Sequence, residues 1–255
     1  MILAVDVGNT QTVLGLFEGA ELDCHWRIHT NEALTSDEIR VKIVALLAAD
    51  GREWGDVERV VLASVVPALT IAYEQIALAS TQTAPMVVGP GLKTGMPIRY
   101  DNPHEVGADR IVNGVAAFAA HGGPVVVVDF GTATTLDVVN GEGAYLGGVI
   151  APGVETSADA LFARAARLSK VDLEPPDRVI GRNTRESVQA GLVLGEAAMV
   201  DGLVRRVWEE LGVESTPVVA TGGLAESMSE QCETVSHVDG DLTLRGLMRI
   251  YELNS

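Results

Sequence analysis

One short motif occurs twice in the sequence: Ile2-Leu3-Ala4-Val5-Asp6-Val7-Gly8-Asn9-Thr10-Gln11-Thr12 near the N-terminus, and Val125-Val126-Val127-Val128-Asp129-Phe130-Gly131-Thr132-Ala133-Thr134-Thr135 about halfway along. Each copy is an apolar run rich in β-branched residues, followed by an aspartate, a glycine and a cluster of small hydroxyl or amide residues. Such a run is typical of a buried strand that ends in a tight turn. The repeat therefore predicts two similar halves, each built around the same kind of turn.

The chemistry of both turns suits a phosphate group. Glycine lets the backbone come close to a ligand, and hydroxyl and amide side chains donate hydrogen bonds to anionic oxygens. The carboxylates of Asp6 and Asp129 would repel a bare phosphate, so they make sense where a cation bridges the two. The alternative is that each aspartate caps a turn and each threonine satisfies nearby backbone groups. The duplication favours phosphate binding, with both aspartates facing a cation.

Composition favours a soluble protein of two domains. The chain has 255 residues and a formal net charge of −17, which disfavours binding to nucleic acid or to an anionic membrane. Cys24 and Cys232 lie far apart without metal-ligand spacing, so neither a disulfide framework nor a zinc site is expected. Glu196 and Asp201 interrupt the apolar residues 192–204, and the N-terminus opens directly on a strand. We therefore expect no membrane span and a cytoplasmic location.

Strands and helices alternate in both halves. In the first half the pattern predicts further strands at residues 12–18, 24–29, 60–64 and 86–88, and helices at residues 36–49 and 67–79. In the second half it predicts strands at residues 125–129, 135–139, 144–150 and 217–220, and helices at residues 184–211 and 242–252. The domain boundary is expected in a helix within residues 110–121. This gives domains of residues 1–115 and 116–255, with the last helix able to pack back on the first domain.

A second candidate site lies in the stretch Tyr100-Asp101-Asn102-Pro103-His104-Glu105-Val106-Gly107-Ala108-Asp109-Arg110, immediately before an apolar helix. An aspartate here can accept or orient the proton of an alcohol, and Arg110 offers paired donors to a carboxylate or phosphate. The alternative is a helix N-terminus in which Asp109 favours the helix dipole and Arg110 forms a surface ion pair. The pattern alone leaves both open.

The order of these elements resembles the actin-like and sugar-kinase architecture. This is an α/β fold in which two ribonuclease-H-like domains enclose a nucleotide cleft between them, and the likeness concerns the fold alone. A Walker A loop is excluded, because no glycine in the sequence is followed directly by lysine.

Five motifs taken together resemble the type III pantothenate kinase family. They are Asp6-Val7-Gly8-Asn9-Thr10, Pro103-His104-Glu105-Val106-Gly107-Ala108-Asp109-Arg110, Asp129-Phe130-Gly131-Thr132-Ala133-Thr134-Thr135, Gly147-Gly148-Val149-Ile150-Ala151-Pro152-Gly153 and Thr221-Gly222-Gly223-Leu224-Ala225. The resemblance spans nearly the whole chain. It implies an enzyme that phosphorylates pantothenate to 4′-phosphopantothenate with ATP, the first step of coenzyme A biosynthesis, and that works as a homodimer.

The same resemblance implies roles for individual residues. Asp109 is the expected catalytic base, and no shifted pKa is required of it, because phosphoryl transfer demands little early proton removal. The expected pantothenate contacts are Tyr100, Gly107, Ala108, Asp109 and Arg110, with Thr184 contributed across the dimer interface. The expected contacts of ATP with Mg²⁺ are Asp6, Val7, Gly8, Asn9, Thr10, Gln11, Thr12 and Val13, together with Thr132, Gly222 and Gly223. Asp129 is expected to bind a monovalent cation, K⁺ or NH₄⁺, and Asp6 to face magnesium.

Two other functions stay open at this point. A kinase for another small alcohol would keep both turns but not the loop of residues 103–110. A non-catalytic regulatory or accessory protein of the same fold would be expected to lose the base or one turn. For Thr184, the residue pattern alone favours a role at the helix N-terminus.

Overall fold

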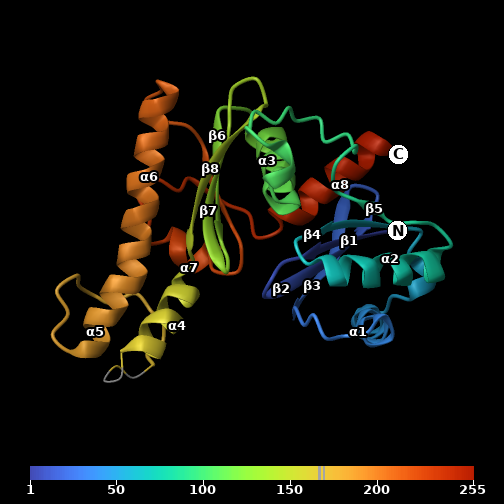
Figure 1. Ribbon diagram of the computed structural model, residues 1–255, viewed down its shortest axis with the longest axis horizontal. Coiled ribbons are helices and arrows are strands. Elements are labelled where there is room, and N and C mark those ends of the chain that lie inside the picture. The colour runs from blue at the N-terminus through green and yellow to red at the C-terminus, as the bar shows by residue number, and fades with distance from the viewer. Residues whose placement is uncertain (166–167, 169) are drawn as a thin grey trace. The chain divides into compact units, whose positions relative to one another are not determined.

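The computed structural model describes residues 1–165, 168 and 170–255, and the chain divides into two compact units (Figure 1). The first unit comprises Met1–Ala116 and Leu242–Ser255, and the second comprises Ala117–Asp241. Each unit contains one five-stranded sheet. The prediction assigned residues 116–255 to the second domain and allowed the last helix to pack back on the first. Helix α8 (Leu242–Asn254) groups with the first unit, because it packs on that unit's sheet.

The sheet of the first unit has the strand order β3-β2-β1-β4-β5. Strands β1 (Ile2–Val7), β2 (Gln11–Glu18) and β3 (Glu21–His29) are antiparallel neighbours, and β4 (Arg59–Ser64) and β5 (Met86–Val87) continue the sheet in parallel. Helices α1 (Ser36–Ala49) and α2 (Pro67–Thr81) bury apolar residues against one face, with the short helix η1 (Trp54–Asp56) between α1 and β4. The predicted order of these strands and helices is confirmed.

The sheet of the second unit repeats this arrangement. Its order is β10-β9-β6-β7-β8, where β6 (Val125–Phe130), β7 (Ala133–Val139) and β8 (Tyr145–Pro152) are antiparallel neighbours. Strands β9 (Val218–Thr221) and β10 (His237–Val238) continue it in parallel. Read from the third strand of each unit, the two sheets have the same order and directions. The duplication expected from the repeated motif is therefore confirmed.

One long helix covers a face of the second sheet. It runs through α5 (Thr184–Gln189), the π-helical stretch η3 (Ala190–Leu194) and α6 (Gly195–Leu211), and ends at Gly212, whose φ is 68°. Its predicted start and end are confirmed. Helices α4 (Val154–Arg164) and α7 (Ala225–Ser229) were not predicted, because neither has a side-chain cap to mark its start.

Among the described residues, the helix Thr184–Leu211 is long and apolar enough to cross a membrane by length and composition alone. The two acids that argued against a span, Glu196 and Asp201, are both buried on its inner face. Asp201 accepts hydrogen bonds from the backbone N–H of Glu233 (2.9 Å) and from Thr234 Oγ1 (2.7 Å). These contacts are those of a helix that packs on a protein core.

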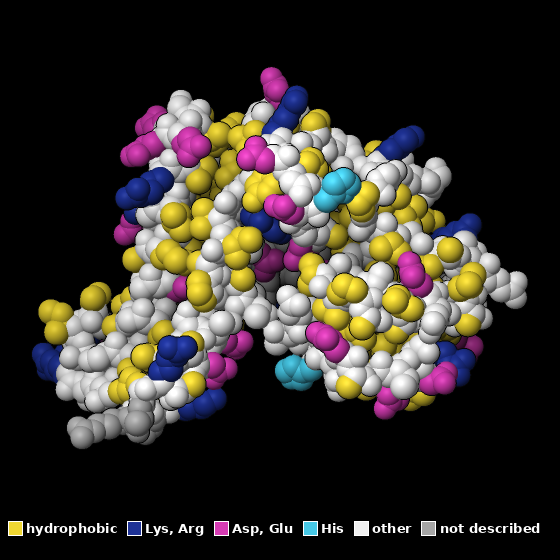
Figure 2. Space-filling model, in the orientation of Figure 1, with side chains coloured by type: hydrophobic (Ala, Val, Ile, Leu, Met, Phe, Trp, Pro, Cys, Tyr) yellow, Lys and Arg dark blue, Asp and Glu magenta, His cyan; other side chains and the backbone are white. Residues whose placement is uncertain are grey.

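Apolar side chains remain exposed near α4 and α5 in the second unit, where yellow atoms lie among basic ones (Figure 2). Val179 and Ile180, in the segment before α5, are 74% and 82% exposed, and Leu161 on α4 is 37% exposed. We call these three residues the α4–α5 apolar surface. Adjacent apolar side chains as exposed as Val179 and Ile180 are candidates for an interaction surface.

Within the first unit, helix α8 packs at a position without a side chain against the start of α3 (Ala108–His121), a helix whose residues up to Ala116 belong to this unit. A Cβ on Gly246 of α8 would lie only 2.7 Å from Val112 Cγ1 of α3, and the Thr243 hydroxyl donates to Asn113 Oδ1 at 2.7 Å. Close helix packing therefore holds the C-terminus on the first unit.

The substitution Gly246→Ala tests this packing. We expect it to lower the free energy of unfolding by about 1–3 kcal/mol, because overpacking against Val112 outweighs the better helix propensity of alanine. Gly202→Ala is the matched control on α6, where no described atom lies within 4 Å of the added Cβ, and it should stabilise by about 0.5–1 kcal/mol. Urea unfolding of both variants is the measurement. A Gly246→Ala protein as stable as the control would show that the crossing tolerates a side chain.

Candidate functional site

The first glycine turn connects β1 to β2. The Gly8 N–H donates to the Gln11 carbonyl at 3.0 Å, and a Cβ on Gly8 would lie 2.9 Å from that same oxygen, so the turn requires glycine. Thr30, at the end of β3, donates its hydroxyl to the Gly8 carbonyl at 2.8 Å. Asn9 and Thr10 are exposed at the tip, whereas Asp6 is half-buried at the end of its strand. The tip can therefore offer backbone and side-chain donors to an anion.

The side chain of Thr12 lies elsewhere. Thr12 is buried, and its hydroxyl is hydrogen-bonded to the hydroxyl of Thr30 at 2.8 Å. The Thr12 hydroxyl is therefore already hydrogen-bonded within the first unit. The expected contact between Thr12 and ATP stays a prediction.

The second glycine turn connects β6 to β7 and is one residue shorter, since the Gly131 N–H donates to the Ala133 carbonyl at 3.1 Å. The Thr132 carbonyl accepts hydrogen bonds from the Gly153 N–H (3.0 Å) and the Thr156 hydroxyl (2.6 Å). These bonds fix the backbone of the turn from the N-terminal end of α4. The Thr132 side chain itself is exposed.

Gly222 allows the turn after β9 to lie against the end of β6. A Cβ on Gly222 would lie 2.6 Å from the Phe130 carbonyl oxygen and would collide with Asp129 Oδ1. The φ of Gly222 is 95°, a conformation that side chains disfavour. The structure therefore brings Asp129, Thr132, Gly222 and Gly223 together at the carboxyl ends of β6 and β9.

The loop before α3 holds the predicted base. Asp109 is half-buried in the first turn of α3, and its Oδ1 accepts the Arg110 N–H at 2.9 Å. The carboxylate lies over Gly107, where a Cβ would collide with Asp109 Oδ1. Burial raises the pKa of Asp109, and the hydrogen bond and charge of Arg110 only partly oppose this. The structure thus gives Asp109 a raised pKa that the sequence argument did not require.

Two further observations concern this loop. Arg110 is buried, so the alternative of a surface ion pair is wrong. Asn102 caps the short helix η2 (Pro103–Glu105): it accepts the His104 N–H at 3.3 Å and donates to Glu105 Oε1 at 2.8 Å. His104 and Glu105 therefore belong to the scaffold of the loop. Tyr100 and Ala108 are half-buried in the same segment.

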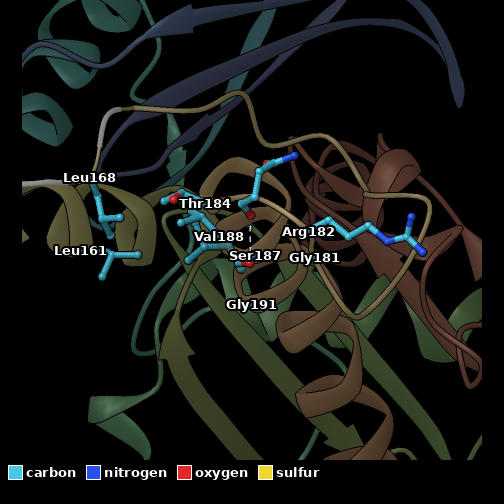
Figure 3. A pocket seen from close by; sticks show the side chains of 10 residues that line it. Leu161, Leu168, Gly181, Arg182, Thr184, Ser187, Val188 and Gly191 are labelled. Atoms are coloured by element: carbon cyan, nitrogen blue, oxygen red, sulfur yellow. Dashed lines mark hydrogen bonds between the residues drawn. The ribbon is translucent and has the colours of Figure 1, made fainter.

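Thr184 lines a groove of about 710 Å³ in the second unit. Among the residues that line this groove, Leu161 of α4 and Leu168 lie beside one another at one side. The side chain of Arg182 extends away from the other lining residues (Figure 3). The cap of α5 is Asn183, whose Oδ1 accepts the Glu186 N–H at 2.9 Å, so the hydroxyl of Thr184 is not needed there. The residues that line this groove do not include the β6–β7 turn. The structure therefore does not bring Thr184 together with Asp129 and Thr132.

The chain offers few groups for a metal held by protein alone. Among the residues described, no three His, Cys, Asp or Glu side chains are grouped as metal ligands. Cys24 and Cys232 are free thiols, and burial raises their pKa values to about 11 and about 12. A single carboxylate at Asp6 does fit Mg²⁺ bound chiefly by substrate phosphates and water.

Two supporting residues, Thr30 and Thr156, were not predicted as parts of the site, and Gly153 was part of a motif without an assigned role. Thr30 lies at the end of the third strand, and its hydroxyl reaches the Gly8 carbonyl only through the register of β2 and β3. No local pattern marks it.

Comparisons with known proteins agree with the motifs. The family described as Type III pantothenate kinase matches residues 2–206. Proteins named Type III pantothenate kinase from Moorella thermoacetica and Myxococcus xanthus are 49% and 51% identical, over 100% of this chain and 100% and 99% of theirs.

Solved structures agree on the fold. A Campylobacter jejuni protein described as a Baf family transcriptional activator has a TM-score of 0.65 at 18% identity, covering 99% of this chain and 98% of that one. The ROK hexokinase of Thermus thermophilus has a TM-score of 0.51 at 15% identity, with 99% and 98% covered. The predicted α/β class, two ribonuclease-H-like domains of the sugar-kinase and actin-like kind, is confirmed. With its family match over residues 2–206 and relatives about half identical along their whole length, the chain belongs to the type III pantothenate kinase family.

Proposed function

We propose that this chain transfers the γ-phosphoryl group of ATP to the primary hydroxyl of pantothenate, giving 4′-phosphopantothenate, the first step of coenzyme A biosynthesis. The observation that carries the proposal is membership of the family along the full chain, with Asp109 held over Gly107 at the start of α3. The direct test is a coupled assay of ADP release with and without pantothenate. Release stimulated by another alcohol but not by pantothenate would redirect the assignment.

Asp109 is the base in this proposal. Burial raises the pKa of its carboxyl, which makes the ionised group a stronger proton acceptor than an exposed aspartate. The Arg110 N–H holds Oδ1 in place, so one carboxylate oxygen is oriented by the backbone of the helix it belongs to. Phosphoryl transfer depends mainly on such positioning and on charge neutralisation. Arg110, Tyr100, Gly107 and Ala108 are the proposed pantothenate contacts of this loop.

The two glycine turns are the proposed sites for the phosphates of MgATP. The exposed tips at Asn9, Thr10 and Thr132 supply donors, and the turn at Gly222 and Gly223 lies beside Asp129. Val7, Gly8, Gln11, Thr12 and Val13 complete the proposed first turn. Magnesium, when bound, neutralises the charge that develops on the transferred phosphoryl group.

Cations have a particular importance in a chain of net charge −17, because the protein itself repels a triphosphate. We assign Asp6 to magnesium and Asp129 to a monovalent cation, K⁺ or NH₄⁺. The position of Asp129 supports this assignment. Residue 222 is a glycine, and a Cβ there would collide with the carboxylate of Asp129.

A homodimer is the proposed working form. The groove that holds Thr184 adjoins the α4–α5 apolar surface, and a second copy of the chain is the proposed occupant. In this arrangement the exposed Thr184 hydroxyl would reach the pantothenate of the partner subunit.

Asp109→Asn is expected to lower kcat by roughly a hundredfold or more, because it removes the base while keeping the shape of the side chain. Asp101→Asn, at an exposed acid of the same loop, should keep wild-type activity. Steady-state kinetics with circular dichroism measure the effect on correctly folded protein. Substantial turnover by Asp109→Asn would require another base.

The same pair of variants tests the raised pKa through stability. A carboxyl whose pKa is raised in the folded state destabilises the protein at pH values above that pKa, where it is ionised. Asp109→Asn should therefore unfold at a higher temperature than wild type at pH 8. This advantage should shrink as the pH falls through the raised pKa. An advantage that grows toward acid pH would contradict the burial of Asp109.

The monovalent cation is tested by replacing potassium in the assay. We expect activity in KCl or NH₄Cl to exceed that in NaCl at equal ionic strength, and Asp129→Asn to lose most of this difference. Equal activity of the wild type in sodium alone would count against the assigned role of Asp129.

The dimer is tested with Ile180→Asp, which places a charge on the α4–α5 apolar surface. We expect this variant to sediment as a monomer with reduced pantothenate kinase activity. Val41→Asp, at an exposed apolar residue on α1, is the control that should stay dimeric. Sedimentation equilibrium distinguishes the two. A dimeric, active Ile180→Asp protein would move the interface elsewhere.

A further inference from the structure

A fully buried carboxyl group lies in the second sheet, close to the β6–β7 turn. Asp137 of β7 is 0% exposed, and its Oδ1 accepts the hydroxyl proton of Tyr145 of β8 at 2.7 Å. Its Oδ2 accepts the hydroxyl proton of Thr135, two residues earlier on the same strand, at 3.2 Å. Each oxygen of Asp137 therefore accepts one hydroxyl proton, an arrangement that suits an ionised carboxylate.

Strand register places this group on the same face of the sheet as Asp129. Thr135 is the partner of Asp129 across β6 and β7, and the side chains of such a pair share a face with their Cβ atoms about 4.5–5.5 Å apart. Asp137 shares that face, because side chains two residues apart on a strand point the same way. Thr221 of β9 is the partner of Asp129 on its other side. Hydroxyl residues therefore flank Asp129 on both neighbouring strands.

The face that carries Asp129 is not the one that packs against α6. The alternate residues Phe130 and Leu136 belong to the apolar core together with Val200 of α6. Asp129 and Thr135 are only half-buried, so an ion from solvent can reach them.

The single proton of Thr135 decides what its oxygen can do. Thr135 gives this proton to Asp137, so its oxygen can only accept from other groups. The carboxylate of Asp129, its partner across the strands, is also an acceptor. Two neighbouring acceptors repel each other unless a cation or a donor lies between them. K⁺ binds to oxygen lone pairs and NH₄⁺ donates protons to them, so both ions fit this pair.

We propose that Asp137 is a positioning residue for the cation site of Asp129, and that it acts by keeping the hydroxyl proton of Thr135 directed at itself. The Thr135 oxygen then lies beside Asp129 as a second oxygen for K⁺ or NH₄⁺. The inference rests on the proposed function only in taking Asp129 as the ligand of a monovalent cation. Asp137 and Tyr145 are not placed in contact with the cation or with the nucleotide.

The alternative is a purely structural role, in which Asp137 only ties β7 to β8 through its bond from Tyr145. A structural role would change stability equally in potassium and in sodium. A positioning role changes the difference between the two salts. The experiment therefore measures that difference.

The first readout is the difference in melting temperature between KCl and NaCl at equal ionic strength, with and without MgATP. An ion that binds only the folded protein raises the melting temperature by an amount that grows with its affinity, so this readout needs no turnover. The second readout is the K⁺ concentration for half-maximal activity in the coupled assay. Asp129→Asn, which removes the proposed ligand, gives the reference for complete loss.

Thr135→Val removes the hydroxyl while keeping the shape of the side chain. It should raise the K⁺ concentration for half-maximal activity about three- to tenfold and remove most of the K⁺ effect on melting temperature. Thr135→Ser keeps the hydroxyl and should stay within about twofold of wild type. Thr243→Val is the matched control, because it also removes a hydroxyl that donates to a side-chain oxygen, Asn113 Oδ1 at 2.7 Å. The control should keep the wild-type response to K⁺.

Asp137→Asn tests the direction of the proton. Asparagine has one acceptor oxygen, so it cannot accept from both Tyr145 and Thr135. The shorter bond from Tyr145 should keep that oxygen, which leaves Thr135 next to the amide NH₂ and turns its proton toward Asp129. Asp137→Asn should therefore lose the K⁺ response as Thr135→Val does. Adding Tyr145→Phe frees the amide oxygen for Thr135 and should restore the response to within about threefold of wild type.

Each result decides the inference. A wild-type K⁺ response in Thr135→Val, its absence in Thr135→Ser, or no recovery when Tyr145→Phe is added to Asp137→Asn would overturn it. If the Asp137 variants do not fold, Thr135→Val and Thr135→Ser decide by the same criteria. A wild type that phosphorylates pantothenate without any response to K⁺ overturns this inference and leaves the proposed function standing. A wild type that K⁺ stabilises but that does not phosphorylate pantothenate refutes the proposed function, and the melting temperatures still judge Asp137.

Discussion

The β6–β7 turn of the second unit depends on backbone segments that pack together with no side chains between them. A side chain at Gly222 would occupy the space of the Phe130 carbonyl, and one at Gly153 would occupy that of the turn at Gly131. The backbone segments that follow β8 and β9 therefore contact the β6–β7 turn directly. Asp129 and Thr132 take their positions from this backbone packing rather than from side-chain rotamers. Such preorganisation is what phosphoryl transfer requires, since its catalysis is mainly positioning and electrostatics.

Buried carboxyl groups show how stability and function compete in this chain. Asp109 lies half-buried over Gly107, and Glu196 is buried with one oxygen unmatched among the described residues. Burial raises the pKa of both groups, which means that each ionised form destabilises the folded protein. At Asp109, the proposed base, this cost accompanies a carboxylate that accepts a proton more readily. Natural proteins tolerate such departures chiefly at functional sites.

The predictability of the site differed from residue to residue. Asp6, Gly8, Asp129 and Gly131 stood out because strand, acid and glycine are adjacent in sequence and the motif is repeated. Asp109 stood out only as one acid of a dense loop, and its role as base came from the family resemblance. Helix α4 escaped prediction because Gly153, its cap, carries no side chain to mark a helix start.

The sequence by itself determined the repeat, the chemistry of both turns, the order of strands and helices and the ends of the long helix, because these depend on neighbouring residues. Only the tertiary structure decided that α8 joins the first unit, that Thr12 corresponds to Thr134, and that the Thr12 hydroxyl bonds to that of Thr30. These relations join residues far apart in the sequence and depend on strand register and on how helices pack over sheets. A local pattern carries no information about either, because both arise from burial of the whole core.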